Sequence, residues 1–226
     1  MKKAKKVVAL ALCAVMLVVG SVAGTMAYLQ DKDTVVNTFT VGNVNINLDE
    51  ANVDVYGNPT QGRTETGNAY KLIPGQKYAK DPTVTVYEGS EKSYVRMLVT
   101  ITDYADVKAV LGTDFLPQYF VEGWNNAVWE TTTAVAVADN AATYEFRYIG
   151  PKATNGIVDA RNAAIELEPL FTHINMPGDG IDATDLESIK EMKIQVVAQA
   201  IQSDNFANAD AAWDKFNNTQ NPVANN

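Results

Sequence analysis

The chain has 226 residues and carries 27 acidic against 18 basic side chains, a formal net charge of −9. Four of the lysines lie within the first six residues, so removal of that segment lowers the net charge to about −13. Such an acidic surface repels phosphate and argues against nucleic acid as a partner. The length predicts one good-sized domain with a full hydrophobic core.

The start of the chain has the layout of a cleavable secretory signal peptide. Lysines within residues 2–6 precede an apolar run over residues 7–19, which is shorter than the about 20 residues that a permanent membrane anchor needs. Small residues follow, with Thr25 and Ala27 at the positions that a signal peptidase reads, and Tyr28 begins the mature chain. We therefore expect a secreted protein of the extracellular matrix or cell surface, which meets the membrane only through the uncleaved leader.

The first mature segment predicts a strand over residues 34–41. Val35, Phe39 and Val41 fall on one face of this strand because side chains alternate along an extended chain. The same period-two pattern predicts further strands, at residues 44–48, 83–87, 94–102, 143–149, 171–176 and 193–202. The last of these has apolar residues on both faces, which favours a central strand.

Loops and helices are predicted from local signals. Residues 51–69 are rich in Gly, Asn and Thr and contain Asn58-Pro59, which indicates a loop. Residues 104–111 and 208–216 are candidate helices. A capping box with Thr184 at the N-cap and Glu187 three residues later predicts a third helix, ending near residue 192.

Together these elements predict an all-β protein with a few short helices in its loops. About eight strands in one domain favour a jelly-roll-like β-sandwich over residues 28–206, preceded by the signal peptide at residues 1–27. Residues 207–226 are expected to form a short helix and then a polar, disordered tail from residue 217.

The residues that metal or catalytic sites need are scarce. The only cysteine, Cys13, lies in the leader, and the single histidine, His173, falls on a predicted strand without a second histidine to form a zinc site. The H-E-x-x-H and G-x-S-x-G motifs are missing. We expect no catalytic residue, no metal and no cofactor, and therefore no enzyme.

Two further groups of residues leave alternatives open. Asp179, Asp182 and Asp185 could bind calcium, although turn and N-cap carboxylates explain the last two. A set of aromatic residues either lines a glycan-binding surface or belongs to the core: Tyr119, Phe120, Trp124, Trp129 and Trp213. The nearly uncharged residues 131–143 form an aggregation-competent strand if they are exposed.

Several segments, in order, resemble a known family. Residues 24–50, GTMAYLQDKDTVVNTFTVGNVNINLDE, place the strand motif T-F-x-x-G directly after the cleavage site, with Thr38, Phe39 and Gly42. LIPGQKYAKDPTVTV over residues 72–86 matches a P-G-x-x-x-x-K-x-x-x-V segment. SYVRMLVTIT, LFTHINMPG and KIQVVAQAIQSDNF follow as later strands. The chain thus resembles the TasA/camelysin-like family of secreted Gram-positive proteins.

The resemblance implies a structural role. Members of the family include fibre subunits of biofilm matrices and are cleaved by a dedicated, endoplasmic-reticulum-type signal peptidase. It implies that the partners are further copies of the chain or related matrix subunits. The metallopeptidase label that camelysin-like proteins have carried finds no ligand chemistry in this sequence.

Three functions are therefore compared. The first is a fibre subunit whose strand with Val35, Phe39 and Val41 adds to a sheet edge of the next copy. The second is a monomeric surface module that binds glycan through its aromatic residues. The metallopeptidase is third, because its ligands are missing.

Mass spectrometry of the secreted protein should find a mature chain that starts at or within one residue of Tyr28. The reason is that Thr25 and Ala27 supply the small side chains that the peptidase pocket requires. An intact leader, or a start far inside the domain, would contradict this assignment.

Overall fold

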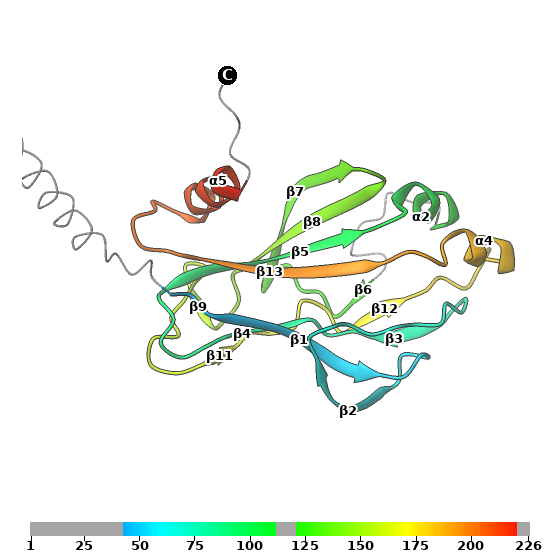
Figure 1. Cartoon of the computed structure of the whole chain (residues 1–226), viewed down its shortest axis with the longest axis horizontal. Coiled ribbons are helices and arrows are strands. Elements are labelled where there is room, and N and C mark those ends of the chain that lie inside the picture. The colour runs from blue at the N-terminus through cyan, green and yellow to red at the C-terminus, as the bar shows by residue number, and fades with distance from the viewer. Residues whose placement is uncertain (1–42, 112–120, 221–226) are drawn as a thin grey trace, which may run out of the picture. The chain divides into compact units, whose positions relative to one another are not determined.

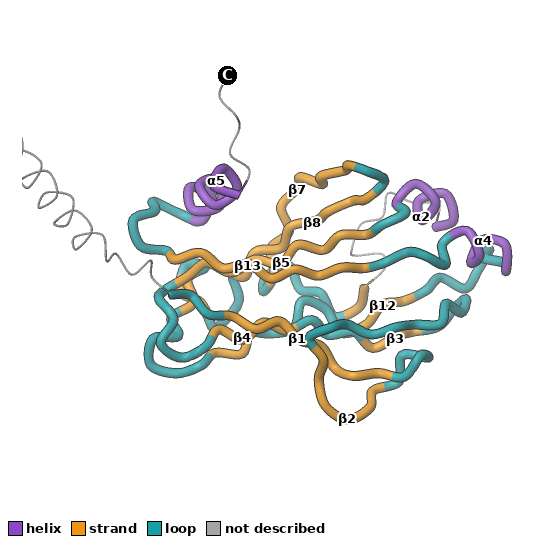
Figure 2. The backbone as a smooth tube through the Cα atoms, in the orientation of Figure 1, coloured by secondary structure: helices purple, strands orange, loops and turns teal. Residues whose placement is uncertain are grey.

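The computed structural model describes residues 43–111 and 121–220 and is predominantly β, with antiparallel sheets and a few short helices, as the sequence predicts. The chain divides into two units, Met1–Val41 and Gly42–Asn226, and all described residues belong to the second. Within those residues, each helix is too short or too polar to cross a bilayer. Figure 2 shows two helices beyond one end of the strands, whereas the C-terminal helix α5 (Ala209–Gln220) lies alongside the large sheet.

The largest sheet is built around β5 (Ser93–Ile101), which pairs along its length with two antiparallel neighbours. One neighbour is β13 (Ile194–Gln202), and the other is β8 (Ala141–Tyr148), which in turn pairs with β7 (Trp129–Ala138). Two short strands, β9 (Ala153–Thr154) and β10 (Ile157–Val158), extend the sheet beside Ser93.

Two smaller sheets complete the fold (Figure 1). One has the order β11-β4-β1-β2 and the other has the order β3-β12-β6. Their strands are β1 (Ile46–Val53), β2 (Pro59–Thr64), β3 (Lys77–Ala79), β4 (Thr83–Val86), β6 (Val121–Glu122), β11 (Ile165–Glu166) and β12 (His173–Asn175).

Strand alternation builds one core between the large sheet and the smaller ones. On β8, Tyr144, Phe146 and Tyr148 are buried while Glu145 and Arg147 face outward, as the sequence predicts. The inward residues of the other strands join the same cluster: Val84, Val86, Val95, Met97, Val99, Ile101 and Ile174.

The outer face of β5 holds the C-terminal helix α5 (Ala209–Gln220) through Arg96. Its guanidinium group lies 4.2 Å from the ring centroid of Trp213 and 5.4 Å from that of Phe216. It also donates hydrogen bonds of 2.8 Å to Gln199 Oε1 and 2.7 Å to Asn217 Oδ1. Helical structure thus continues to Gln220, so the tail predicted from residue 217 begins too early.

Three other sequence predictions change. The predicted loop over residues 51–69 contains the end of β1 and all of β2. The helix near residue 184 is α4 (Ala183–Ser188), whose N-cap is Asp182 rather than Thr184. Asp182 Oδ1 accepts from the N–H groups of Thr184 and Asp185, and these bonds lower the pKa of Asp182. The helix α2 (Tyr104–Leu111) forms as predicted.

The most consequential correction concerns β13, which is not a central strand. In the part of the chain that the structure describes, it pairs with β5 alone, so its other edge has no strand partner. Its even-numbered residues pack against the core, whereas Val197 is 50% exposed on the other face. Apolar residues on both faces therefore mark an edge strand here and not a buried one.

Trp213→Ala should lower the free energy of unfolding by about 3–5 kcal/mol, because it removes a fully buried aromatic side chain and the ring against which Arg96 packs. Urea denaturation followed by circular dichroism measures the change. Lys215→Ala on the exposed side of α5 is the matched control and should stay within about 0.5 kcal/mol. Equal, small effects of both would show that α5 adds nothing to the fold.

Candidate functional site

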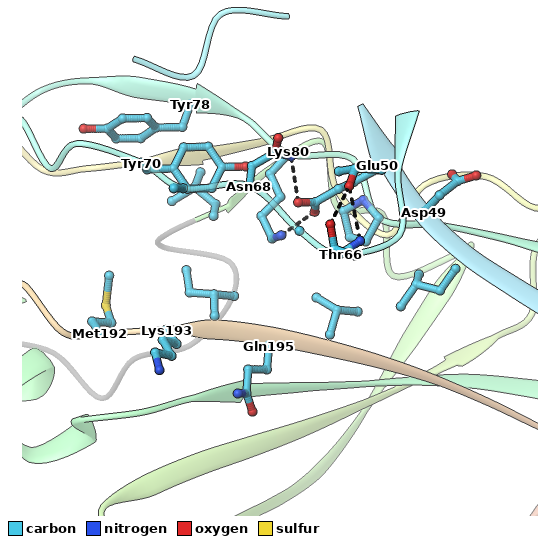
Figure 3. A pocket seen from close by; sticks show the side chains of 18 of the residues that line it. Asp49, Glu50, Thr66, Asn68, Tyr70, Tyr78, Lys80, Met192, Lys193 and Gln195 are labelled. Carbon is cyan, nitrogen blue, oxygen red and sulfur yellow. Dashed lines mark hydrogen bonds and ion pairs between the residues drawn. The ribbon is translucent and has the colours of Figure 1, made fainter. Parts of the chain in front are cut away.

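A groove of about 800 Å³ lies between β1 and β13, and we call it the β1–β13 groove (Figure 3). One wall is formed by β13 from Ile194 to Val197, and the opposite wall by β1 from Leu48 to Glu50 together with residues 64–70. The apolar residues that line it include Leu48, Leu72, Tyr78, Ile174, Met176, Met192, Ile194 and Val196.

The free edge of β13 lacks the features that usually prevent an edge strand from pairing with another strand. Its sequence, IQVVAQAIQ, contains no charged residue and no proline, and nine consecutive residues pair with β5 without a bulge. Natural proteins usually protect such an edge with charges, proline or irregular pairing, because its free N–H and C=O groups accept another strand. Among the described residues, nothing of this kind protects β13.

The β1 wall has a free half-edge as well. Ile46 to Asp49 pair with β4, whereas the pairing with β2 begins only at Glu50. The first half of β1 therefore has a strand partner on one side only within the described residues. Figure 1 shows β1 and β13 running next to each other, and the two strands lie in contact.

A buried ion pair interrupts the apolar lining of the groove. The side chains of Glu50 and Lys80 are only 8% and 7% exposed and contact each other directly through Glu50 Oε2 and Lys80 Nζ. Asn68 Nδ2 donates a 2.9 Å hydrogen bond to Glu50 Oε1. Figure 3 shows these three side chains together beside Thr66 and Tyr70. The charges are tolerated in the interior because each has a partner.

Two tyrosines support this polar cluster. Tyr70 and Tyr78 meet edge to face, with ring centroids 5.4 Å apart. Tyr70 Oη donates a 3.1 Å hydrogen bond to the carbonyl oxygen of Ala79, next to Lys80. Burial and, to a smaller extent, the charge of Glu50 raise the pKa of Tyr70, so its hydroxyl stays protonated at neutral pH.

Backbone geometry fixes Tyr78 in turn. A Cβ atom at Gly57 would lie 2.6 Å from the Cα of Tyr78, and Gly57 has a φ of +79°, so only glycine fits at this crossing. Tyr78 Oη donates a 2.6 Å hydrogen bond to the carbonyl oxygen of Lys71 and accepts one from the N–H of Ile73. The loop that leads into β3 is thereby held against the groove.

The structure does not describe the site residues proposed from the sequence. The signal-peptidase residues Thr25, Ala27 and Tyr28 and the assembly-strand residues Val35, Phe39 and Val41 all fall outside the described residues. Glu50 and Lys80 were not identified as site residues from the sequence. A signal for each was nevertheless present: Glu50 continues the inward alternation of Ile46 and Leu48, and Lys80 is the lysine of the P-G-x-x-x-x-K segment.

The candidate metal residues do not form a site in the described part of the chain. His173 on β12 lies 3.0 Å from Thr172 Oγ1 through its Nδ1 atom, and its register partners are Ala79 and Glu122. Asp182 and Asp185 cap α4. No group of three or more His, Cys, Asp or Glu side chains within residues 43–111 and 121–220 is placed to hold a metal ion.

The aromatic residues considered for glycan binding contribute to packing instead. Trp129 and Trp213 are buried, and Trp124 stacks edge to face on Phe146 at 5.9 Å. Tyr119 and Phe120 fall outside the described residues.

Residues 131–138, part of the strand predicted to be aggregation-competent if exposed, lie on β7, which pairs with β8 alone within the described part of the chain.

The chain matches none of the protein-family models, curated proteins or solved structures with which it was compared. Its candidate site is therefore defined by geometry alone.

Lys80→Met should lower the free energy of unfolding by roughly 3–5 kcal/mol, because it leaves the Glu50 carboxylate buried without its cation. The double variant Glu50→Leu/Lys80→Met should recover most of this loss, because two apolar side chains of similar volume replace the pair. Urea unfolding monitored by tryptophan fluorescence measures both. A double variant no more stable than the single one would show that the pair is not the cause.

Proposed function

We propose that the chain is a secreted structural subunit that assembles into extracellular fibres of a biofilm matrix. The donor is the N-terminal strand with Val35, Phe39 and Val41, and the acceptor is the β1–β13 groove of the next copy. The proposed jelly-roll topology and cleavage after Ala27 by a dedicated signal peptidase belong to the same hypothesis. Partners are then further copies of the chain or related matrix subunits.

The observation that carries this proposal is the unguarded edge of β13 inside an apolar groove. A strand placed there would extend the large sheet by main-chain hydrogen bonds and bury its inward side chains among Leu48, Ile194 and Val196. The eight residues 34–41 span about 27 Å when extended. Ile194 to Val197, four of the nine residues of β13, line the groove and offer an edge for part of that strand.

The direction of such a contact leads to a fibre. The donor strand and the acceptor groove are different surfaces of the chain, so each contact is head-to-tail. A head-to-tail contact that does not close into a ring produces a filament. An uncleaved leader would hold the donor strand at the membrane, so cleavage would release the chain for assembly.

Phe39→Asp in the mature chain should abolish fibres, because the inserted strand would bring an unpaired carboxylate into an apolar groove. Deletion of residues 28–36 should have the same effect. Thr40→Asp is the matched control: it adds the same charge on the opposite face of the strand and should leave assembly largely intact. Negative-stain electron microscopy and sedimentation of the purified mature variants measure the outcome.

Two results would contradict the proposal in different ways. Fibres from the deletion variant would show that another edge joins the subunits, with β7 as the next candidate. A mature wild-type chain that stays monomeric across pH and salt conditions would favour the second hypothesis, a surface module that binds its ligand as a monomer.

A further inference from the structure

The donor strand has a single polar residue on its apolar face. In an extended strand over residues 34–41, Val35, Asn37, Phe39 and Val41 share one side. Asn37 thus interrupts an otherwise apolar face near its middle. Burial of an amide without a hydrogen-bonding partner is unfavourable, so an acceptor that takes this face must offer a polar group at one place.

The lining of the β1–β13 groove contains one buried pair of opposite charges among the described residues. Ile46 and Leu48 on β1 pack against the core, and Glu50 follows on the same face of the strand. Among the described charged lining residues, only Glu50 and Lys80 are buried, whereas Asp49 is partly exposed and Glu65, Lys190 and Lys193 are exposed. The buried pair is therefore the place where an inserted strand would meet charges that are shielded from water.

The ion pair has hydrogen-bonding capacity beyond its present partners. A carboxylate accepts up to about four hydrogen bonds and an ammonium group donates three. Glu50 accepts from Lys80 and Asn68, and Lys80 Nζ donates to Glu50. An asparagine amide supplies a donor for the carboxylate and an acceptor for the ammonium group, whereas valine or phenylalanine supplies neither.

We propose that the Glu50–Lys80 pair receives Asn37 of the neighbouring copy and thereby fixes the register of the inserted strand. This inference rests on the proposed function, because it assigns the docking position within the same groove. A slip by two residues would place Val35 or Phe39 against the buried charges. A slip by one residue would turn the apolar face outward. A single buried polar residue selects register in coiled coils in the same way.

The test uses the full mature chain and begins with the donor alone. Asn37→Leu makes the donor face more apolar and leaves the groove unchanged. A purely hydrophobic groove would bind this variant more tightly, whereas the present proposal predicts a critical concentration for assembly raised about tenfold or more. Thr38→Leu is the matched control on the opposite face and should change the critical concentration less than threefold, roughly.

A second arm changes the acceptor. The double variant Glu50→Leu/Lys80→Met replaces the buried charges of the groove by apolar side chains. A chain with this double substitution and the wild-type Asn37 should assemble poorly. The triple variant, which also carries Asn37→Leu, should assemble well. Such mutual rescue measures a direct coupling between the two sites. Thermal unfolding of each variant by circular dichroism shows whether the acceptor variants fold. If they do not fold, the comparison of Asn37→Leu with Thr38→Leu alone tests the proposed register.

The outcomes separate this inference from the proposed function. Wild-type fibres together with an Asn37→Leu variant that assembles equally well or better would overturn the register assignment and leave strand addition in place. Triple-variant fibres no better than those of the acceptor variant would overturn it as well. A wild-type mature chain that forms no fibres would overturn both.

Discussion

The pairing of β5 on both of its edges is the constraint on which the rest of the fold depends. Because β8 and β13 take its two edges, β5 lies inside the large sheet; its odd-numbered side chains enter the core, and Arg96 lies on the outer face. Arg96 is almost fully buried there by Trp213 and Phe216, so α5 becomes a cover for this face. Within the described residues, β13 is the last strand on this side of the sheet. Its free edge therefore forms one wall of the groove.

A strand edge that is apolar, regular and uncharged is an aggregation hazard for a protein, because another extended chain can pair with it. The surrounding acidic surface reduces random association through mutual repulsion of like-charged copies. Repulsion of this kind is long-ranged and is screened by salt, whereas strand pairing acts only at contact. Under the proposed function, the combination would keep copies apart at long range and allow them to join by strand pairing at short range.

Period-two alternation was sufficient to predict β5 and β8, because burial on one face of a strand produces a regular pattern of apolar and polar residues. It failed for β2, whose Pro59 and Gly62 are typical of loops but are tolerated on an edge strand. The two apolar faces of β13 also gave the wrong position in the sheet, since Val197 is exposed at an edge. The Glu50–Lys80 pair could not be predicted, because it joins residues thirty positions apart whose proximity depends on the tertiary fold.

A buried ion pair is a poor way to gain stability, since apolar residues of similar volume often serve as well or better. Its presence in the wall of the groove is better explained by selectivity. A wholly apolar groove would accept many strands, including the nearly uncharged β7 of the same protein. In the proposed assembly, Glu50 and Lys80 would penalise every strand that does not offer a polar group at their position, which is a form of discrimination that attraction alone does not provide. The proposed acceptor would then combine a strand edge with little selectivity of its own and a charge pair that limits which strands bind.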